Sequence, residues 1–211
     1  MNNGPIALFG GSFNPVHFGH LRIATELAEA LQVECIRMMP CALVPELGAA
    51  TASQRLDMVK LAISKQSIIQ AESIELQMPA PSYSVNTVRR MREQIGAETP
   101  LFLCIGMDAL NGLDNWHDWR EILDYCHIVV SSRPDWNSPE SGVLANWIST
   151  HRCDDLVALK EQARGYIHFC DLTMLAISST GIRKKIQSSE TIRFLTPDSV
   201  VDYIQQQHLY E

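Results

Sequence analysis

Two histidines stand three residues apart in the stretch GGSFNPVHFGH, residues 10–20, which follows the short apolar run IALF. His17 and His20 are separated by about one helical turn, so their rings can face the same ligand atom. Imidazole donates hydrogen bonds to phosphate oxygens whether it is neutral or charged. Gly10 and Gly11 let the backbone turn sharply and approach a ligand closely. The pattern therefore predicts a site in which both histidines bind one phosphate.

The helix expected after this turn adds to the predicted anion site. A helix that begins near His17 or Phe18 presents free N–H groups and the positive end of its dipole to the same point. Gly19 leaves room for a base or a ribose against that helix. The dinucleotide fingerprint GxGxxG and the Walker A pattern are both absent from the stretch. The competing interpretation is a surface histidine pair or an ordinary helix cap.

A second candidate phosphate motif is ISSTGIRKK, residues 177–185. Ser178, Ser179 and Thr180 are suited to cap the basic helix that follows, and their hydroxyl and N–H groups can meet phosphate. Arg183 lies on the first turn of that helix and can form paired hydrogen bonds with phosphate oxygens. Taken alone, the motif is equally consistent with a capped helix that has a solvated basic face.

The two motifs together resemble the H-x-G-H and I-S-S-T-x-I-R signatures of the nucleotidyltransferase α/β-phosphodiesterase superfamily. The resemblance implies that His17 and His20 stabilise the transition state at the α-phosphate of ATP and that Arg183 binds its other phosphates. Asn14 stands where many bacterial members have Asp, and it is compatible with the motif. The candidate ATP-binding residues are Gly10, Gly11, Ser12, Phe13, Gly19, Ser178, Ser179, Thr180 and Arg133.

Further segments resemble one branch of this superfamily, the bacterial nicotinate mononucleotide adenylyltransferases. These segments are PSYSVNTV (81–88), IGMDAL (105–110), NWHDWREIL (115–123), SSRPD (131–135) and YIQQQHLY (203–210). The resemblance implies an enzyme of NAD biosynthesis that joins ATP to nicotinate mononucleotide, giving nicotinate adenine dinucleotide and pyrophosphate. It also implies a Mg²⁺ cofactor held mainly by the ATP phosphates, with no metal site built by the protein.

Four residues match the family's mononucleotide-binding positions: Tyr83, Ser84, Asp108 and Trp116. Trp116 offers a face on which a pyridinium ring can stack. The helix that begins near Ser84 can supply N–H donors to the nicotinate carboxylate. Asp108 follows a predicted strand, at the end of the sheet where α/β proteins bind ligands. For Tyr83 and Trp116, a place in the core is the alternative.

The chain departs from this family in the loop after its second predicted strand. The family usually carries Pro-Pro-His-Lys/Arg there, whereas this chain has Val44, Pro45, Glu46 and Leu47. Arg55 matches a basic position downstream, and the sequence leaves open whether it reaches the site. Two alternatives therefore stay open. In the first alternative, the enzyme transfers the adenylyl group to nicotinamide mononucleotide or to another phosphorylated acceptor. In the second, the protein binds nucleotides and has weak catalytic activity.

Composition and charge limit the classes of partner. The chain has 211 residues, a formal net charge of −7 and 46% hydrophobic residues. An acidic surface repels nucleic-acid backbones, so no nucleic-acid partner is expected. No apolar stretch approaches the roughly 18 residues of a membrane span, so no membrane partner is expected. The six cysteines are scattered without a CxxC pair, which is typical of reduced thiols and a cytoplasmic protein. An oligomeric state is not predicted.

Apolar periodicity predicts the elements that would position these residues. Strands are expected at 5–10, 33–39, 68–76, 100–106, 127–134 and 166–172. Helices are expected at 21–31, 53–65, 84–96, 119–126, 178–187 and 197–207. This alternation predicts the α/β class, a Rossmann-like doubly wound fold with a mostly parallel sheet and helices on both faces. Ligands would then bind at the carboxyl ends of the strands, near the topological switch point.

The domain organisation follows from the same pass along the chain. No linker, internal repeat or low-complexity tract divides it, so residues 1–211 are expected to form a single nucleotidyltransferase domain. The stretch 135–165 is the least regular and is expected to be an insertion with one or two helices. Ser53 is the expected N-cap of the second helix, and Gly96 is expected to end the third.

Overall fold

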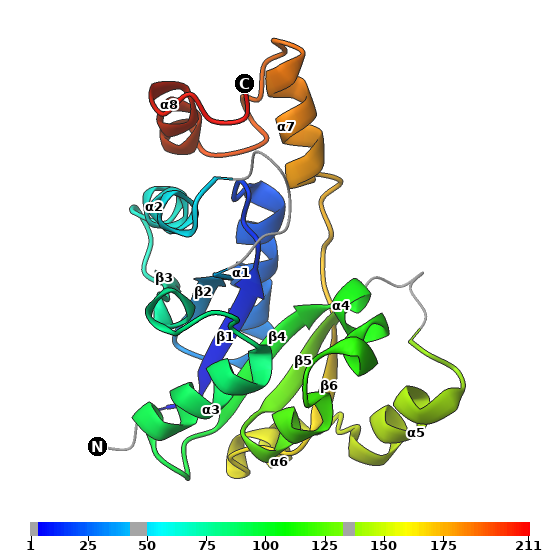
Figure 1. Ribbon diagram of the computed structural model, residues 1–211. Coiled ribbons are helices and arrows are strands. Elements are labelled where there is room, and N and C mark those ends of the chain that lie inside the picture. Colours follow the sequence, from blue (N-terminus) through cyan, green and yellow to red (C-terminus); the bar gives the residue numbers. More distant parts are fainter. Residues whose placement is uncertain (1–3, 43–49, 133–137) are drawn as a thin grey trace.

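The computed structural model describes residues 4–42, 50–132 and 138–211. Its centre is a six-stranded sheet in the order β3-β2-β1-β4-β5-β6, and every pair of neighbouring strands is parallel (Figure 1). The strands are β1 (Ile6–Gly11), β2 (Ile36–Pro40), β3 (Ile69–Ala71), β4 (Leu101–Gly106), β5 (His127–Ser132) and β6 (Ile167–Asp171). The predicted α/β fold with a parallel sheet is confirmed.

Helices cover both faces of this sheet, because alternate residues of each strand point to opposite sides. In β1, Ala7 and Phe9 join one buried cluster, whereas Ile6 and Leu8 join the other. The first cluster includes side chains of α1 (Phe18–Leu31), α2 (Ala52–Ala62), α6 (Leu156–Glu161), α7 (Ser179–Gln187) and α8 (Asp198–Gln206). The second includes side chains of α3 (Ser84–Ile95), α4 (Met107–Asn111) and α5 (Gly142–His151).

The topological switch point lies between β1 and β4, since the chain continues from β1 to β2 on one side and from β4 to β5 on the other. The crevice outside the carboxyl ends of such strands is the usual ligand site of doubly wound sheets. Here β1 ends at Gly11, which is in register with Pro40, and β4 ends at Gly106. In Figure 1, α7 and α8 lie at the end of the molecule toward which the strand arrows point.

Several predicted boundaries need correction. The extended segment expected at 68–76 contains only the short strand β3, followed by a 3-10 helix, η1, at Ile74–Gln77. The helix expected at 119–126 is also a 3-10 helix, η3, at Trp119–Asp124. A further 3-10 turn, η2, spans Leu113–Asn115. Short 3-10 segments escape periodicity arguments because they are too brief to show a repeat.

The cap of α2 also differs from the expectation. Thr51, rather than Ser53, is its N-cap: the Thr51 hydroxyl accepts from the Gln54 N–H at 3.3 Å, and the Gln54 side chain accepts from the Thr51 N–H at 2.9 Å. This reciprocal pair is a capping box. Gly96 ends α3 with a φ of 88°, as expected. The stretch 135–165 contributes α5 and α6, in agreement with the prediction of one or two helices.

No helix in the described parts of the chain is both long and apolar enough to cross a membrane.

Candidate active site

The two histidines form the N-terminus of α1 through an unusual capping box. His17 is the N-cap residue, and its Nδ1 accepts a hydrogen bond from the His20 backbone N–H at 3.4 Å. In return, Nδ1 of His20 accepts from the His17 N–H at 3.3 Å. The two rings are stacked, with their centroids 3.6 Å apart. Because each Nδ1 is an acceptor, we assign the proton of each neutral ring to Nε2, where it can be donated to an anion.

Burial keeps both imidazoles neutral. His17 is 5% exposed, and burial lowers its pKa to about 4. Burial also lowers the pKa of His20, and a charge on the adjacent His17 lowers it further. At neutral pH the pair therefore offers two hydrogen-bond donors rather than two positive charges.

The glycines of the first motif make room for rings of the same motif. A Cβ atom at Gly11 would lie 2.9 Å from the Phe13 ring, and one at Gly19 would lie 2.9 Å from Nδ1 of His17. Phe13 is fully buried and packs edge-on against His20 at 5.0 Å. The residue of the turn that adopts the left-handed conformation is Phe13, with φ 45°, and not Gly10 or Gly11. The expectation that the glycines make the sharp turn is therefore corrected.

The second motif is fastened to the first. Ser179 donates a hydrogen bond from its hydroxyl to the Pro15 carbonyl at 2.9 Å, across 164 residues of sequence. Arg183 Nη1 donates to the Asn14 carbonyl at 2.7 Å, across 169 residues. Ser178 is the N-cap of α7 and accepts from the Gly181 N–H at 3.1 Å. The structure thus brings the two predicted phosphate motifs together at the N-termini of α1 and α7.

Thr180 completes this group of candidate residues. Its hydroxyl accepts from Nη2 of Arg183 at 3.4 Å, so it contacts the guanidinium from the first turn of α7. Ser12 lies in the turn after β1 and is exposed. Arg133 lies outside the described residues. The same is true of the positions at which the loop after the second strand differs from the family: Val44, Pro45, Glu46 and Leu47.

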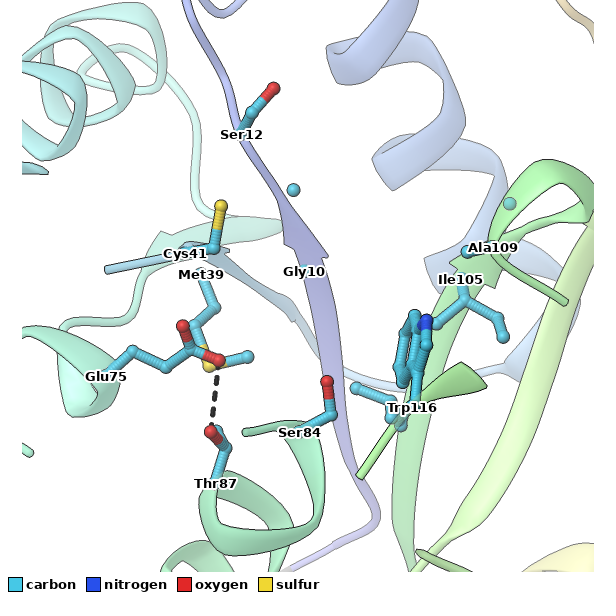
Figure 2. Close-up of a pocket in the computed structure, with 13 residues that line it drawn as sticks. Gly10, Ser12, Met39, Cys41, Glu75, Ser84, Thr87, Ile105, Ala109 and Trp116 are labelled. Atoms are coloured by element: carbon cyan, nitrogen blue, oxygen red, sulfur yellow. Dashed lines mark hydrogen bonds between the residues drawn. The ribbon is translucent and has the colours of Figure 1, made fainter. Parts of the chain in front are cut away.

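A pocket of about 280 Å³ opens beside the turn, at the switch point between β1 and β4. Figure 2 shows Trp116 and Ile105 on one side of the end of β1, and Met39 and Glu75 on the other. Its lining is mainly apolar, with polar groups at a few points. The lining residues are Gly10, Gly11, Ser12, Met39, Cys41, Glu75, Ser84, Thr87, Leu103, Ile105, Gly106, Ala109 and Trp116.

Two of the four predicted mononucleotide-binding residues line this pocket. Ser84 is the first residue of α3, and Trp116 follows η2. Tyr83 is the N-cap residue of α3, is 40% exposed, and lies with its ring 4.3 Å from that of His117. Asp108 is exposed on α4. Neither Tyr83 nor Asp108 lines the pocket.

Arg55 connects two segments of the site by hydrogen bonds. The sequence alone left open whether this residue reaches the site. It is 1% exposed, and its guanidinium donates to the Ser12 carbonyl at 2.8 Å and to the Cys41 carbonyl at 2.6 Å. It also donates to the carbonyls of Ala42 and Ala50. Arg55 therefore joins the turn after β1 to the segment after β2. The available signal was its spacing on α2, which places it on the same buried side as Met58 and Val59.

Glu75 is a second such link, and sequence reasoning missed it. This carboxylate is 5% exposed and lines the pocket. It accepts from the Ala42 N–H at 3.0 Å and from the Thr87 hydroxyl at 3.0 Å, the latter drawn in Figure 2. Glu75 thereby ties the segment after β2 to α3. Nothing in the sequence pattern singled it out, because the segment was expected to be extended.

A cluster of at least three histidine, cysteine or acidic side chains that could hold a metal ion is not found among the described residues.

Comparison with known proteins assigns the family. A cytidylyltransferase-like family model matches residues 8–190. A probable nicotinate-nucleotide adenylyltransferase of Psychromonas ingrahamii is 40% identical over 98% of this chain and 97% of its own. A probable nicotinate-nucleotide adenylyltransferase of Dechloromonas aromatica is 41% identical over 98% of this chain and 97% of its own.

A solved structure gives the same fold at much lower sequence identity. The nicotinic acid mononucleotide adenylyltransferase of Plasmodium falciparum, complexed with NaAD, superposes with a TM-score of 0.73 at 15% identity, covering 98% of this chain and 97% of that one. This likeness supports the fold, and the curated relatives support the branch. The chain belongs to the cytidylyltransferase-like family and, within it, to the nicotinate-nucleotide adenylyltransferases.

Proposed function

We propose that this protein transfers the adenylyl group of ATP to nicotinate mononucleotide, forming nicotinate adenine dinucleotide and releasing pyrophosphate. A 5′-phosphate oxygen of the mononucleotide attacks the α-phosphorus of ATP in line, and the bond from that phosphorus to the bridging oxygen of pyrophosphate breaks. The observation that carries the proposal is the stacked pair His17 and His20 at the N-terminus of α1, joined to Arg183 through Asn14 at the switch point of the sheet.

The histidine pair is assigned to the α-phosphate. The second pKa of a phosphate monoester is about 6, so the attacking oxygen is ionised at neutral pH and needs no general base. Catalysis then consists of positioning and of stabilising charge that develops on the α-phosphate oxygens. Two Nε2–H donors held by a capping box suit this task, because they do not have to reorganise during the reaction.

Arg183 is assigned to the leaving group. Arg183 is the fifth residue of α7, and its guanidinium reaches back to Thr180 on the first turn; charge-assisted hydrogen bonds from it to the β- and γ-phosphates would stabilise the departing pyrophosphate. The turn amides, Gly10, Gly11, Ser12, Phe13 and Gly19, together with Ser178, Ser179, Thr180 and Arg133, are proposed as the rest of the ATP-binding set. Mg²⁺ is proposed to arrive as part of the substrate MgATP.

The pocket beside the turn is assigned to the mononucleotide. Trp116 supplies an aromatic face for the pyridinium ring, and the first turn of α3, which begins at Ser84, supplies N–H donors to the nicotinate carboxylate. Neither Tyr83 nor Asp108 lines the pocket, so contacts between these two residues and the mononucleotide remain predictions. The mainly apolar wall suits a flat heteroaromatic ring.

The test is a coupled pyrophosphate-release assay with ATP and each mononucleotide. Release with nicotinate mononucleotide at a kcat/KM well above that for nicotinamide mononucleotide is the expected result. A preference for the amide, or for another phosphorylated acceptor, would overturn the choice of acceptor while keeping the chemistry. Calorimetric binding of ATP without any release of pyrophosphate would instead favour a nucleotide-binding protein with weak or no turnover.

A further inference from the structure

The segment after α8 folds back toward the first motif in an unusual backbone conformation. His208 and Tyr210 have φ values of 50° and 69°, both in the left-handed region that non-glycine residues rarely adopt. The Leu209 N–H donates to the Ile204 carbonyl at 3.0 Å, which closes the turn. Leu209 and Tyr210 are both buried. His208 and Tyr210 together turn the backbone so that the Tyr210 side chain points to the first motif. Backbone outliers of this kind often mark functional positions.

The Tyr210 side chain reaches the turn of the first motif, which lies between β1 and α1. The Tyr210 hydroxyl donates a hydrogen bond to Oδ1 of Asn14 at 2.7 Å, across 196 residues of sequence. Asn14 is fully buried, and the same oxygen accepts from the Ala50 N–H at 3.2 Å. Loss of the Tyr210 hydroxyl therefore removes one hydrogen bond from this buried oxygen, while the bond from the Ala50 N–H remains.

Asn14 passes this constraint to a residue of the proposed chemistry. Its backbone carbonyl is the acceptor for Arg183 Nη1 at 2.7 Å. Asn14 therefore touches Tyr210 through its side chain and Arg183 through its main chain. A displacement of Asn14 moves the acceptor that sets the direction of the guanidinium, and an error of about 1 Å in such a group is costly for catalysis.

We propose that Tyr210 is a positioning residue for adenylyl transfer, which holds Asn14 so that Arg183 is directed at the phosphates of ATP. The inference rests on the proposed function, because Arg183 has its role only in that reaction. It assigns a task to a residue of the segment YIQQQHLY (203–210), which the proposed function does not use. Tyr210 touches neither substrate in this account, and it acts through Asn14.

The experiment compares Tyr210→Phe with a matched control, Tyr203→Phe. Tyr203 belongs to α8, and its hydroxyl lies 3.5 Å from Asp57 on α2, in a hydrogen bond that does not involve the turn. We expect Tyr210→Phe to lower kcat by about 3- to 10-fold, the effect of one lost hydrogen bond, with an unchanged KM for the mononucleotide. Tyr203→Phe should leave kcat unchanged. Assays are run well below the melting temperature of each variant.

A double-mutant cycle with Arg183→Ala separates positioning from general support of the fold. If Tyr210 acts through Arg183, adding Tyr210→Phe to Arg183→Ala should lower kcat by less than about twofold further. Equal kcat for the wild type and Tyr210→Phe, or full multiplication of the two losses, would overturn the inference. A wild-type protein that releases no pyrophosphate would refute the proposed function itself, so the two failures are distinguishable.

Discussion

The turn that carries the histidines and the pocket beside it are built in opposite ways. In the turn, four successive or nearly successive carbonyls accept hydrogen bonds from distant side chains: Ser12 from Arg55, Asn14 from Arg183, Pro15 from Ser179 and Val16 from Thr196. The wall of the pocket is mostly apolar, and Tyr83, which precedes the lining residue Ser84, is 40% exposed.

This contrast matches the two tasks of the proposed reaction. Stabilising charge in a transition state needs donors that are fixed before the substrate arrives, which a turn with anchored carbonyls provides. Binding a flat ring needs mainly contact area, which an apolar wall provides. Substitutions on the turn side should therefore act on kcat, whereas substitutions on the pocket side should act on KM for the mononucleotide.

The largest effect is expected for His20→Ala. Loss of one preorganised donor to the α-phosphate should lower kcat by about 10²- to 10³-fold, while far-UV circular dichroism stays that of the wild type. Steady-state pyrophosphate release measures the change. His151→Ala is the control, because His151 lies on α5 and bonds to the Trp147 carbonyl. Near wild-type turnover of His20→Ala would remove the histidine pair from the mechanism.

Arg183→Ala should have the next largest effect. Because the guanidinium is proposed to act on the leaving group, its loss is expected to lower kcat by about 10²-fold in the same assay. Lys184→Ala is a matched control on the same helix, since Lys184 is exposed. If the two variants lost activity equally, the effect would come from the charge of α7 as a whole and not from the geometry of Arg183.

Trp116→Ala tests the pocket side of the comparison. Stacking on an aromatic side chain is worth about 1–3 kcal/mol per base, so KM for the mononucleotide should rise roughly tenfold. KM for ATP and kcat should change little. Trp116→Phe retains an aromatic face and should recover most of the affinity. A large fall in kcat with an unchanged KM would contradict the division of labour between the two regions.

The last expected effect is on acid stability and not on turnover or affinity. The pKa of His17 is about 4 in the folded protein, against 6.5 in the unfolded chain, so between these values the unfolded state binds more protons. The free energy of unfolding should therefore fall as the pH falls from 6.5 toward 4, by at most about 1.4 kcal/mol per pH unit for this group. The contribution of His17 to the pH dependence fades above pH 6.5, as the unfolded chain also loses its proton.

His17→Asn isolates this contribution, because asparagine is a good N-cap residue that does not titrate. Urea unfolding of both proteins between pH 4.5 and 7.5 should give a flatter pH dependence for the variant. Parallel curves through that window would mean that another group carries the acid sensitivity of the turn.

Most of the fold was predictable because its signals are local. The apolar runs of β1, β4 and β5 are buried on both faces and need no knowledge of the rest of the chain. The wrong assignments fall on short 3-10 segments such as η1, where hydrogen bonding within four residues overrides a weak extended pattern. The cap of α2 was displaced by two residues, because the Thr51–Gln54 pair forms a reciprocal box that Ser53 does not.

The site was predictable only in part, for a different reason. His17, His20 and Arg183 are marked by residue type and spacing, which survive in a one-dimensional sequence. Arg55, Glu75 and Tyr210 form hydrogen bonds with Ser12, Thr87 and Asn14, which lie 43, 12 and 196 residues away, and neither their type nor their spacing points to those partners. Such links become visible only once the chain is folded.

The long separations of these links also have a kinetic consequence. The side-chain donors to the carbonyls of Asn14, Pro15 and Val16, and the Tyr210 hydroxyl that donates to the Asn14 amide oxygen, come from residues 164 to 196 positions later in the chain. Contacts of such high sequence separation form slowly, because the chain loses the conformational entropy of a long loop before the contacts contribute any stabilising free energy. The turn that precedes α1 is thus translated early yet completed late, and on refolding the recovery of turnover should lag behind the recovery of helical signal.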